Sequence, residues 1–155
     1  MQVSDVMTRG ITTVSPYASV CGAARTMDRL NVGALPVCSG ERLVGIVTDR
    51  DITVRSTAAG DSPHATRVCD VMSDDVCWCY DDTPVDAAED RMGRLQVRRL
   101  PVVDRGRRLV GMVSLGDLVT CQSPNVEGTL RAISEPSEPD RGGGPMPLGG
   151  RYTED

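Results

Sequence analysis

The sequence predicts an α/β (α+β) fold in which two β-α-β-β-α repeats pack sheet to sheet about a pseudo-twofold axis. Three observations lead to this fold class. The chain of 155 residues matches itself in order at an offset of about 65 residues, and each copy alternates extended with helical patterns. One copy alone would leave one face of its sheet in water, so a second copy must cover that face.

Four short motifs recur in the same order in both copies. They are residues 5–8 with 70–73, 20–30 with 85–95, 35–37 with 100–102, and 43–48 with 109–114. The offset increases by one residue before the last motif, which places a single insertion in the second copy. Matches in this number and order indicate a duplicated unit of about 60 residues.

Each copy starts with a short extended segment, at 12–14 and at 76–80. Apolar residues at spacings of three and four follow, and they predict a helix with one buried stripe. In the second copy we expect Thr83 as the N-cap of this helix and Pro84 at its first position. The first copy has Ala18 at the cap position, which predicts a weaker start.

Two strands joined by a hairpin, followed by a second helix, complete each copy. Turn residues at 39–41 and 104–106 separate the predicted strands, which are 33–38 and 43–47 in the first copy and 98–103 and 109–113 in the second. Each copy then continues into a hydroxyl-x-x-aspartate motif, which is typical of a helix start.

These elements divide the chain into a first repeat at 1–60, a linker at 61–67 and a second repeat at 68–121. The remaining residues, 122–155, hold six Gly and five Pro and few apolar side chains. Such a segment buries too little apolar surface to offset its loss of conformational entropy. We therefore expect a disordered, acidic tail, with a transient helical turn at 126–133.

Composition excludes several classes of function. The net charge of −5 argues against non-specific nucleic-acid binding. All 17 basic residues are Arg, so a Schiff-base or P-loop lysine is excluded. No apolar stretch long enough to span a bilayer and no secretory leader is visible. We therefore expect a cytoplasmic protein that contacts no membrane.

The paired motifs resemble the cystathionine-β-synthase (CBS) domain. In the first copy, 33–37 reads Gly-Ala-Leu-Pro-Val and 43–51 reads Leu-Val-Gly-Ile-Val-Thr-Asp-Arg-Asp. The second copy repeats the pattern at 98–104 and 110–117. Two such domains in tandem form a Bateman module. The resemblance covers residues 3–121 and extends to small stand-alone bacterial CBS-pair proteins of the hypoxic-response type.

The resemblance implies a regulatory sensor that binds an adenosine-containing ligand in the cleft between the two repeats. AMP, ADP or ATP is the usual ligand, with NAD, S-adenosylmethionine or a cyclic dinucleotide as variants. It also implies a flat homodimer that controls an effector protein. The sequence holds no catalytic triad, nucleophile elbow or Walker loop, so we expect no catalysis, no resident cofactor and no metal.

Two motifs, Thr48-x-x-Asp51 and Ser114-x-x-Asp117, carry the predicted site. Taken alone, each is a capping box that satisfies the N–H groups of a helix start. The same geometry allows the carboxylate to accept hydrogen bonds from a ribose diol, while the hydroxyl and the first-turn N–H groups face a phosphate.

Arg98 and Arg99 distinguish the two predicted clefts. The resemblance implies that the residues before the Leu-Pro-Val strand face the phosphate of the nucleotide whose ribose is held by the other copy. That reasoning places both guanidinium groups with Asp51, because Arg pairs bidentately with phosphate. The cleft with Asp117 would lack this charge and bind nothing, or only a neutral nucleoside. The alternative is that both Arg form surface ion pairs of little energetic value.

The resemblance adds Thr13 as a contact to the base or ribose, and Arg50 either joins the phosphate site or only covers the helix start. The predicted nucleotide-binding residues are then Thr13, Thr48, Arg50, Asp51, Arg98, Arg99, Pro101, Ser114 and Asp117. Two other functions stay open. The protein could be a ligand-free dimeric scaffold, or a thiol redox or metal sensor that uses Cys77 and Cys79. Those two cysteines would project to one face of a strand, where buried packing is the simpler explanation.

Overall fold

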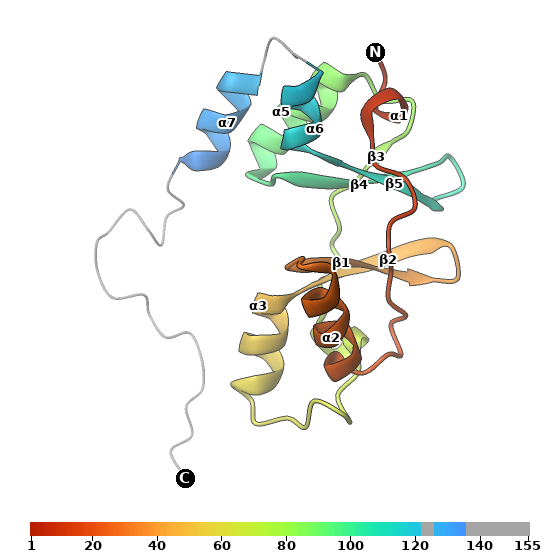
Figure 1. Ribbon diagram of the computed structural model, residues 1–155, viewed down its shortest axis with the longest axis vertical. Helices are drawn as coiled ribbons and strands as arrows, with labels where there is room; N and C mark the ends of the chain where they lie inside the picture. The colour runs from red at the N-terminus through yellow and green to blue at the C-terminus, as the bar shows by residue number, and fades with distance from the viewer. Residues whose placement is uncertain (122–125, 136–155) are drawn as a thin grey trace.

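The computed structural model describes residues 1–121 and 126–135. Two helix-on-sheet layers stack with their sheets facing each other at the centre of the molecule and their helices outside (Figure 1). A cluster of buried residues, Cys38, Leu43 and Val103, lies between the sheets. This arrangement confirms the predicted mixed fold, and its cause is the one expected, since each sheet covers the inner face of the other.

Repeat 1 contains a two-stranded antiparallel sheet with its helices on the outer face (Figure 1). Its elements are α2 (Val20–Leu30), β1 (Ala34–Ser39), β2 (Arg42–Thr48), α3 (Asp49–Asp51) and the π-helix η1 (Ile52–Thr57). The strand expected at 12–14 makes only one parallel bridge, from Val14 to Val37.

Repeat 2 has the same order of elements with a three-stranded sheet, β3-β4-β5. Its elements are β3 (Cys79–Tyr80), α5 (Val85–Leu95), β4 (Arg99–Val103), β5 (Leu109–Ser114) and α6 (Leu115–Thr120). Strand β3 is parallel to β4, and β4 is antiparallel to β5. Both hairpins shift register at one residue pair, between Val37 and Cys38 and between Val102 and Val103.

The helix starts differ from the prediction in both repeats. In α2 the N-cap is Ser19, whose hydroxyl accepts the N–H of Gly22 at 3.0 Å. In α5 the N-cap is Pro84, which has no side-chain acceptor, so the helix begins one residue later than expected. The carbonyl of Thr83 instead accepts the N–H of Val3. The first copy therefore has the stronger cap, the reverse of the expectation.

The two repeats exchange their first helical turns. Helix α1 (Val3–Val6) packs into the core of repeat 2, and α4 (Val68–Val71) packs into the core of repeat 1. Val3 and Val68 are both fully buried in these positions. The exchange ties the repeats together, because each core is incomplete without a segment from the other half of the sequence.

Two glycines allow the exchanged segments to approach the sheets closely. A Cβ at Gly111 would lie 2.7 Å from the Met7 sulfur and 2.8 Å from the Thr8 carbonyl oxygen. A Cβ at Gly45 would meet the equivalent atoms of Met72 and Ser73 at 2.6 and 3.0 Å. Only glycine fits at these two crossings without a shift of the neighbouring backbone.

Helix α7 (Val126–Ser134) lies within the segment 122–155 for which the sequence predicts disorder. It packs beside α5 and α6 (Figure 1), with Val126 and Ile133 against the core of repeat 2. The amide of Gln96 donates to the carbonyls of Ala132 and Glu135 at the end of this helix. Tertiary packing thus stabilises a helix that composition alone did not favour. Residues 122–125 and 136–155 of the predicted tail lie outside the described residues.

Glu89 is an exception within the core of repeat 2. Its side chain is fully buried on α5, the helix that α7 covers, and neither carboxylate oxygen has a hydrogen-bond partner in the described part of the chain. The equivalent position in repeat 1 is the exposed Ala24.

No helix in 1–121 or 126–135 is long and apolar enough to cross a membrane.

Candidate functional site

A cavity of about 380 Å³ opens between the two repeats. One wall comes from the segment after α1, a second from the start of β1, and a third from β4, β5 and the first turn of α6. Its lining includes Thr8, Arg9, Gly10, Ile11, Thr12, Leu30, Val32, Ala34, Leu35, Pro36, Arg99, Met112, Ser114 and Asp117. Because α1 crosses to repeat 2, the segment that follows it passes directly over β5.

The Asp117 carboxylate is held in place by the helix start. Its Oδ2 accepts the Ser114 N–H at 2.7 Å and the Ser114 hydroxyl at 2.8 Å, while the Asp117 N–H donates to Ser114 Oγ at 3.2 Å. This is the predicted capping box. Oδ1 has no hydrogen-bond partner among the described residues, so the carboxylate is oriented and one of its oxygens stays available to a hydroxyl donor.

Two guanidinium groups share the cavity with this carboxylate. Arg99 is the first residue of β4 and lies directly opposite Ser114 in the sheet register. Arg9 lines the cavity from the segment after α1 and donates to the Ser4 carbonyl at 3.3 Å. The prediction that the Asp117 cleft lacks positive charge is therefore wrong. Cross-strand pairing within repeat 2 brings Arg99 to Asp117, a neighbour relation that sequence order does not show.

The remaining lining of the cavity is largely apolar. Ile11, Val32 and Leu35 contribute branched side chains from repeat 1, and Met112 contributes a flexible one from β5. Thr12 lines this cavity, whereas the predicted Thr13 lines a neighbouring one of about 230 Å³ that shares Gly10 and Ile11 with it. An apolar wall opposite a few placed polar groups is the usual composition of a small-molecule site.

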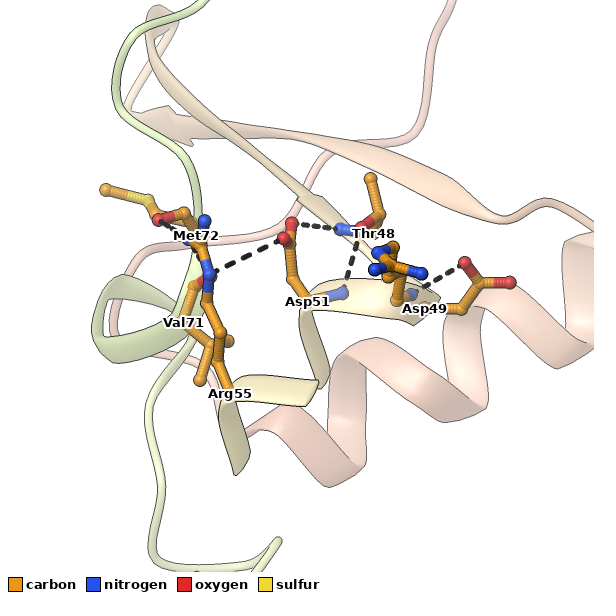
Figure 2. Close-up of polar contacts among 7 residues, drawn as sticks. Thr48, Asp49, Asp51, Arg55, Val71 and Met72 are labelled. Carbon is orange, nitrogen blue, oxygen red and sulfur yellow. Dashed lines mark hydrogen bonds and ion pairs between the residues drawn. The ribbon is translucent and has the colours of Figure 1, made fainter. Parts of the chain in front are cut away.

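Asp51 has the same capping box but a different neighbour (Figure 2). Its Oδ2 accepts the Thr48 N–H at 2.9 Å, and its own N–H donates to Thr48 Oγ1 at 3.0 Å. Its Oδ1 lies 3.9 Å from Arg55 Nε. Nη1 of Arg55 in turn donates to the carbonyls of Val71 and Met72 at 3.0 and 3.2 Å. Both oxygens of this carboxylate therefore face groups of the protein.

The other predicted residues are placed apart from the cavity. Arg50 is exposed, and its N–H donates to Asp49 Oδ1 at 2.8 Å. Arg98 is exposed immediately before β4, where its carbonyl accepts the Leu115 N–H. Pro101 is buried opposite Met112 in the sheet. Of the nine predicted residues, the cavity brings together Arg99, Ser114 and Asp117.

Sequence reasoning missed Arg9 and Thr12. Arg9 directly follows the motif at 5–8, and the second copy has Asp74 at the matching position. That difference between copies was visible in the sequence. Its consequence for the site depends on the exchange of α1, which brings Arg9 next to repeat 2.

The two cysteines that suggested a redox or metal sensor contact the same cluster. Cys79 is 2% exposed in the core of repeat 2, and the half-buried Cys77 packs against that core. Burial raises the pKa of the Cys79 thiol to about 11, although the charge of Arg91 partly opposes this. Cys79 is therefore a protonated thiol at neutral pH and a poor nucleophile. Within 1–121 and 126–135, no group of three or more His, Cys, Asp and Glu side chains could hold a metal.

Comparisons with known proteins agree with the motifs. The CBS domain profile matches residues 3–56 and 68–123, which confirms the resemblance. The CBS domain-containing protein YhcV of Bacillus subtilis (strain 168) is 42% identical over 79% of this chain and 86% of its own length.

Solved structures show the same likeness. Hypoxic Response Protein I, solved with two coordinated zinc ions, superposes with a TM-score of 0.71 at 32% identity, covering 78% of this chain and 98% of that one. CBSX2, solved in complex with AMP, superposes with a TM-score of 0.70 at 28% identity, covering 78% and 95%.

Proposed function

The chain belongs to the CBS-domain family, and from this premise we propose that it is a non-catalytic regulatory module that binds an adenosine-containing nucleotide at Asp117. One observation carries the proposal. The cavity between the repeats combines an oriented carboxylate, two guanidinium groups and an apolar wall. The AMP complex of CBSX2 supports the ligand class, because that protein superposes on this chain.

Each group in the cavity matches one part of a nucleotide. Asp117 Oδ1 can accept hydrogen bonds from a ribose diol, because Oδ2 already anchors the carboxylate. Arg99 and Arg9 supply positive charge for a phosphate. The apolar side chains offer a surface on which the base is removed from water.

Regulation would follow from differential binding. A nucleotide in this cavity contacts both repeats at once, so it favours whichever packing of the repeats holds the walls at the right separation. We propose that a homodimer of the chain presents this change to an effector protein. The ligand can shift that equilibrium only by its difference in affinity between the two packings.

Calorimetric titration of the full chain tests the proposal. The panel is AMP, ADP, ATP, NAD and S-adenosylmethionine, and we expect at least one ligand to bind below millimolar concentration. Arg99→Ala should weaken AMP much more than adenosine, because adenosine has no phosphate for the guanidinium to contact. Equal losses for both ligands would remove the phosphate role of Arg99, and no binding across the panel would remove the nucleotide proposal.

The second candidate is a ligand-free dimeric scaffold. One observation favours it: both carboxylate oxygens of Asp51 already face groups of the protein, namely the Thr48 N–H and the Arg55 guanidinium, so this carboxylate needs no ligand. Sedimentation of the purified chain with and without AMP separates the two. A scaffold would form a dimer that the nucleotide leaves unchanged in shape and stability.

A further inference from the structure

We infer that Arg55 closes the Asp51 side of the molecule, so that one chain binds a single nucleotide, at Asp117. This inference rests on the proposed function. It adds that one chain binds one nucleotide and that Arg55 is the residue that prevents a second from binding. It comes from the difference between two sites whose backbone geometry is the same.

The two capping boxes are equivalent in detail. In both, the carboxylate Oδ2 accepts the N–H of the hydroxyl residue three positions earlier, at 2.9 Å for Asp51 and 2.7 Å for Asp117. In both, the hydroxyl oxygen accepts the N–H of the aspartate in return. Helix-start geometry therefore gives the two sites the same chance of binding a ribose.

The difference beside the carboxylate itself lies one helical turn further along the chain. Arg55 is four residues after Asp51, and its Nε lies 3.9 Å from Asp51 Oδ1 (Figure 2). Four residues after Asp117 stands Cys121, whose thiol turns back to the Leu118 carbonyl at 3.1 Å. Repeat 1 therefore places a guanidinium beside the carboxylate oxygen that repeat 2 leaves to the cavity.

Arg55 is anchored on its other side as well. Its Nη1 donates to the carbonyls of Val71 and Met72, at the C-terminal end of α4. Carbonyls at a helix end lack partners within the helix and favour a cation. A ligand approaching Asp51 would have to displace a side chain that makes contacts in two directions.

The corresponding segment in repeat 2 leads directly into the cavity. The residues matching Val71 and Met72 are Val6 and Met7, at the end of α1. The next residues along the chain, Thr8 and Arg9, line the 380 Å³ cavity together with Asp117. The cavity therefore reaches the Asp117 carboxylate, whereas Arg55 lies beside the Asp51 carboxylate.

A reciprocal exchange of these two residues tests the inference, with AMP as the probe. Arg55→Cys gives repeat 1 the residue of repeat 2, and Cys121→Arg does the opposite. By calorimetry we expect one AMP per wild-type chain and at least a tenfold loss of affinity in Cys121→Arg. We expect two per Arg55→Cys chain, the second bound more weakly, because repeat 1 has Ala34 and Asp74 where repeat 2 has Arg99 and Arg9. Arg55→Lys, which keeps the cation, should stay at one. Circular dichroism and thermal melting of each variant confirm that it is folded.

The outcomes separate this inference from the proposed function. One AMP bound by wild type and still one by Arg55→Cys would overturn the role of Arg55 and leave the nucleotide site standing. Weaker binding in Arg55→Cys would also overturn it, because Arg55 would then be a ligand contact. No binding by wild type with one AMP bound by Arg55→Cys would refute the Asp117 site and retain the closure. No binding by either protein would refute both.

Discussion

Repeat 1 and repeat 2 of this chain share a backbone plan and differ in the chemistry attached to it. Both have a hairpin with one register shift, a capping box at the start of the last helix, and a glycine where the exchanged turn crosses the sheet. They differ at Arg55 and Cys121, at Ala24 and Glu89, and at Ser19 and Pro84.

The fold requires some of these features in both repeats, whereas other positions can carry different side chains in the two repeats. A β-strand register or a tight glycine crossing tolerates few alternatives, because backbone groups must pair and Cβ atoms must fit. A residue one turn past a helix cap can change without loss of the fold. One of the two matched clefts can therefore keep its carboxylate for a ligand while the other uses it for internal contacts.

The largest expected effect is on ligand affinity at the two aspartates. Asp117→Asn should weaken AMP binding by about 10- to 100-fold, because a charge-assisted hydrogen bond is worth about 1.5–3 kcal/mol. Asp51→Asn, the matched control, should change affinity less than threefold. Calorimetry of both variants measures the contrast. A larger loss in Asp51→Asn would reverse our assignment of the two clefts.

The two glycine crossings should behave alike. Gly111→Ala and Gly45→Ala should each destabilise the protein by about 1–3 kcal/mol, because the new methyl group overlaps a sulfur and a carbonyl oxygen. Gly128→Ala, where nothing lies within 4 Å, should be neutral or raise stability slightly as a better helix former. Urea denaturation gives the three values. If either crossing tolerated alanine, the exchanged turns would not pack as tightly as described.

Glu89 should limit the stability of repeat 2. Glu89→Met removes a buried carboxylate that has no hydrogen-bond partner among residues 1–121 and 126–135, and it keeps the side-chain length, so we expect a gain of about 1–3 kcal/mol. Asp90→Asn on the exposed side of the same helix should change stability by less than about 0.5 kcal/mol. Thermal melting compares them. A loss in Glu89→Met would show that the carboxylate has a role in docking α7.

The helix caps give the smallest expected difference. Ser19→Ala should cost about 1 kcal/mol, because the Gly22 N–H loses its acceptor. Ser4→Ala, at a serine in α1 with no side-chain hydrogen bond within the described residues, is the control and should have little effect. Chemical denaturation of the two variants is sufficient. Equal values would mean that the Ser19 cap contributes nothing to the start of α2.

Much of the fold followed from local patterns. The strands of both hairpins and the two long helices lie near their predicted positions, because side-chain periodicity reports which face is buried. The capping boxes at Thr48 and Ser114 could also be predicted, since each depends only on a hydroxyl residue and an aspartate three positions later. For α7 the sequence predicted only a transient helical turn at 126–133 in a disordered tail, because the stability of this helix comes from packing against α5 and α6.

The candidate site was harder to predict. An ion pair between Asp51 and Arg55 could be expected from their i, i+4 spacing. The carbonyls that also bind Arg55 belong to α4, which is distant in sequence. The family resemblance places Arg99 with the aspartate of the other copy, Asp51, whereas in the structure Arg99 is paired across the β4–β5 sheet with Ser114, next to Asp117.

The sequence by itself determined that this protein is a duplication, where each copy turns, and that two aspartates stand at equivalent helix starts. The turns and helix starts depend on residues within a few positions of one another, and the duplication is visible when the two halves of the sequence are aligned. Only the tertiary structure decided that Asp117 shares a cavity with Arg9 and Arg99 and that the carbonyls of Val71 and Met72 hold Arg55. Arg99 reaches Asp117 through the β4–β5 pairing. Arg9 and the two carbonyls reach their positions because α1 and α4 cross between the repeats, and such a crossing is selected by the burial of both cores together.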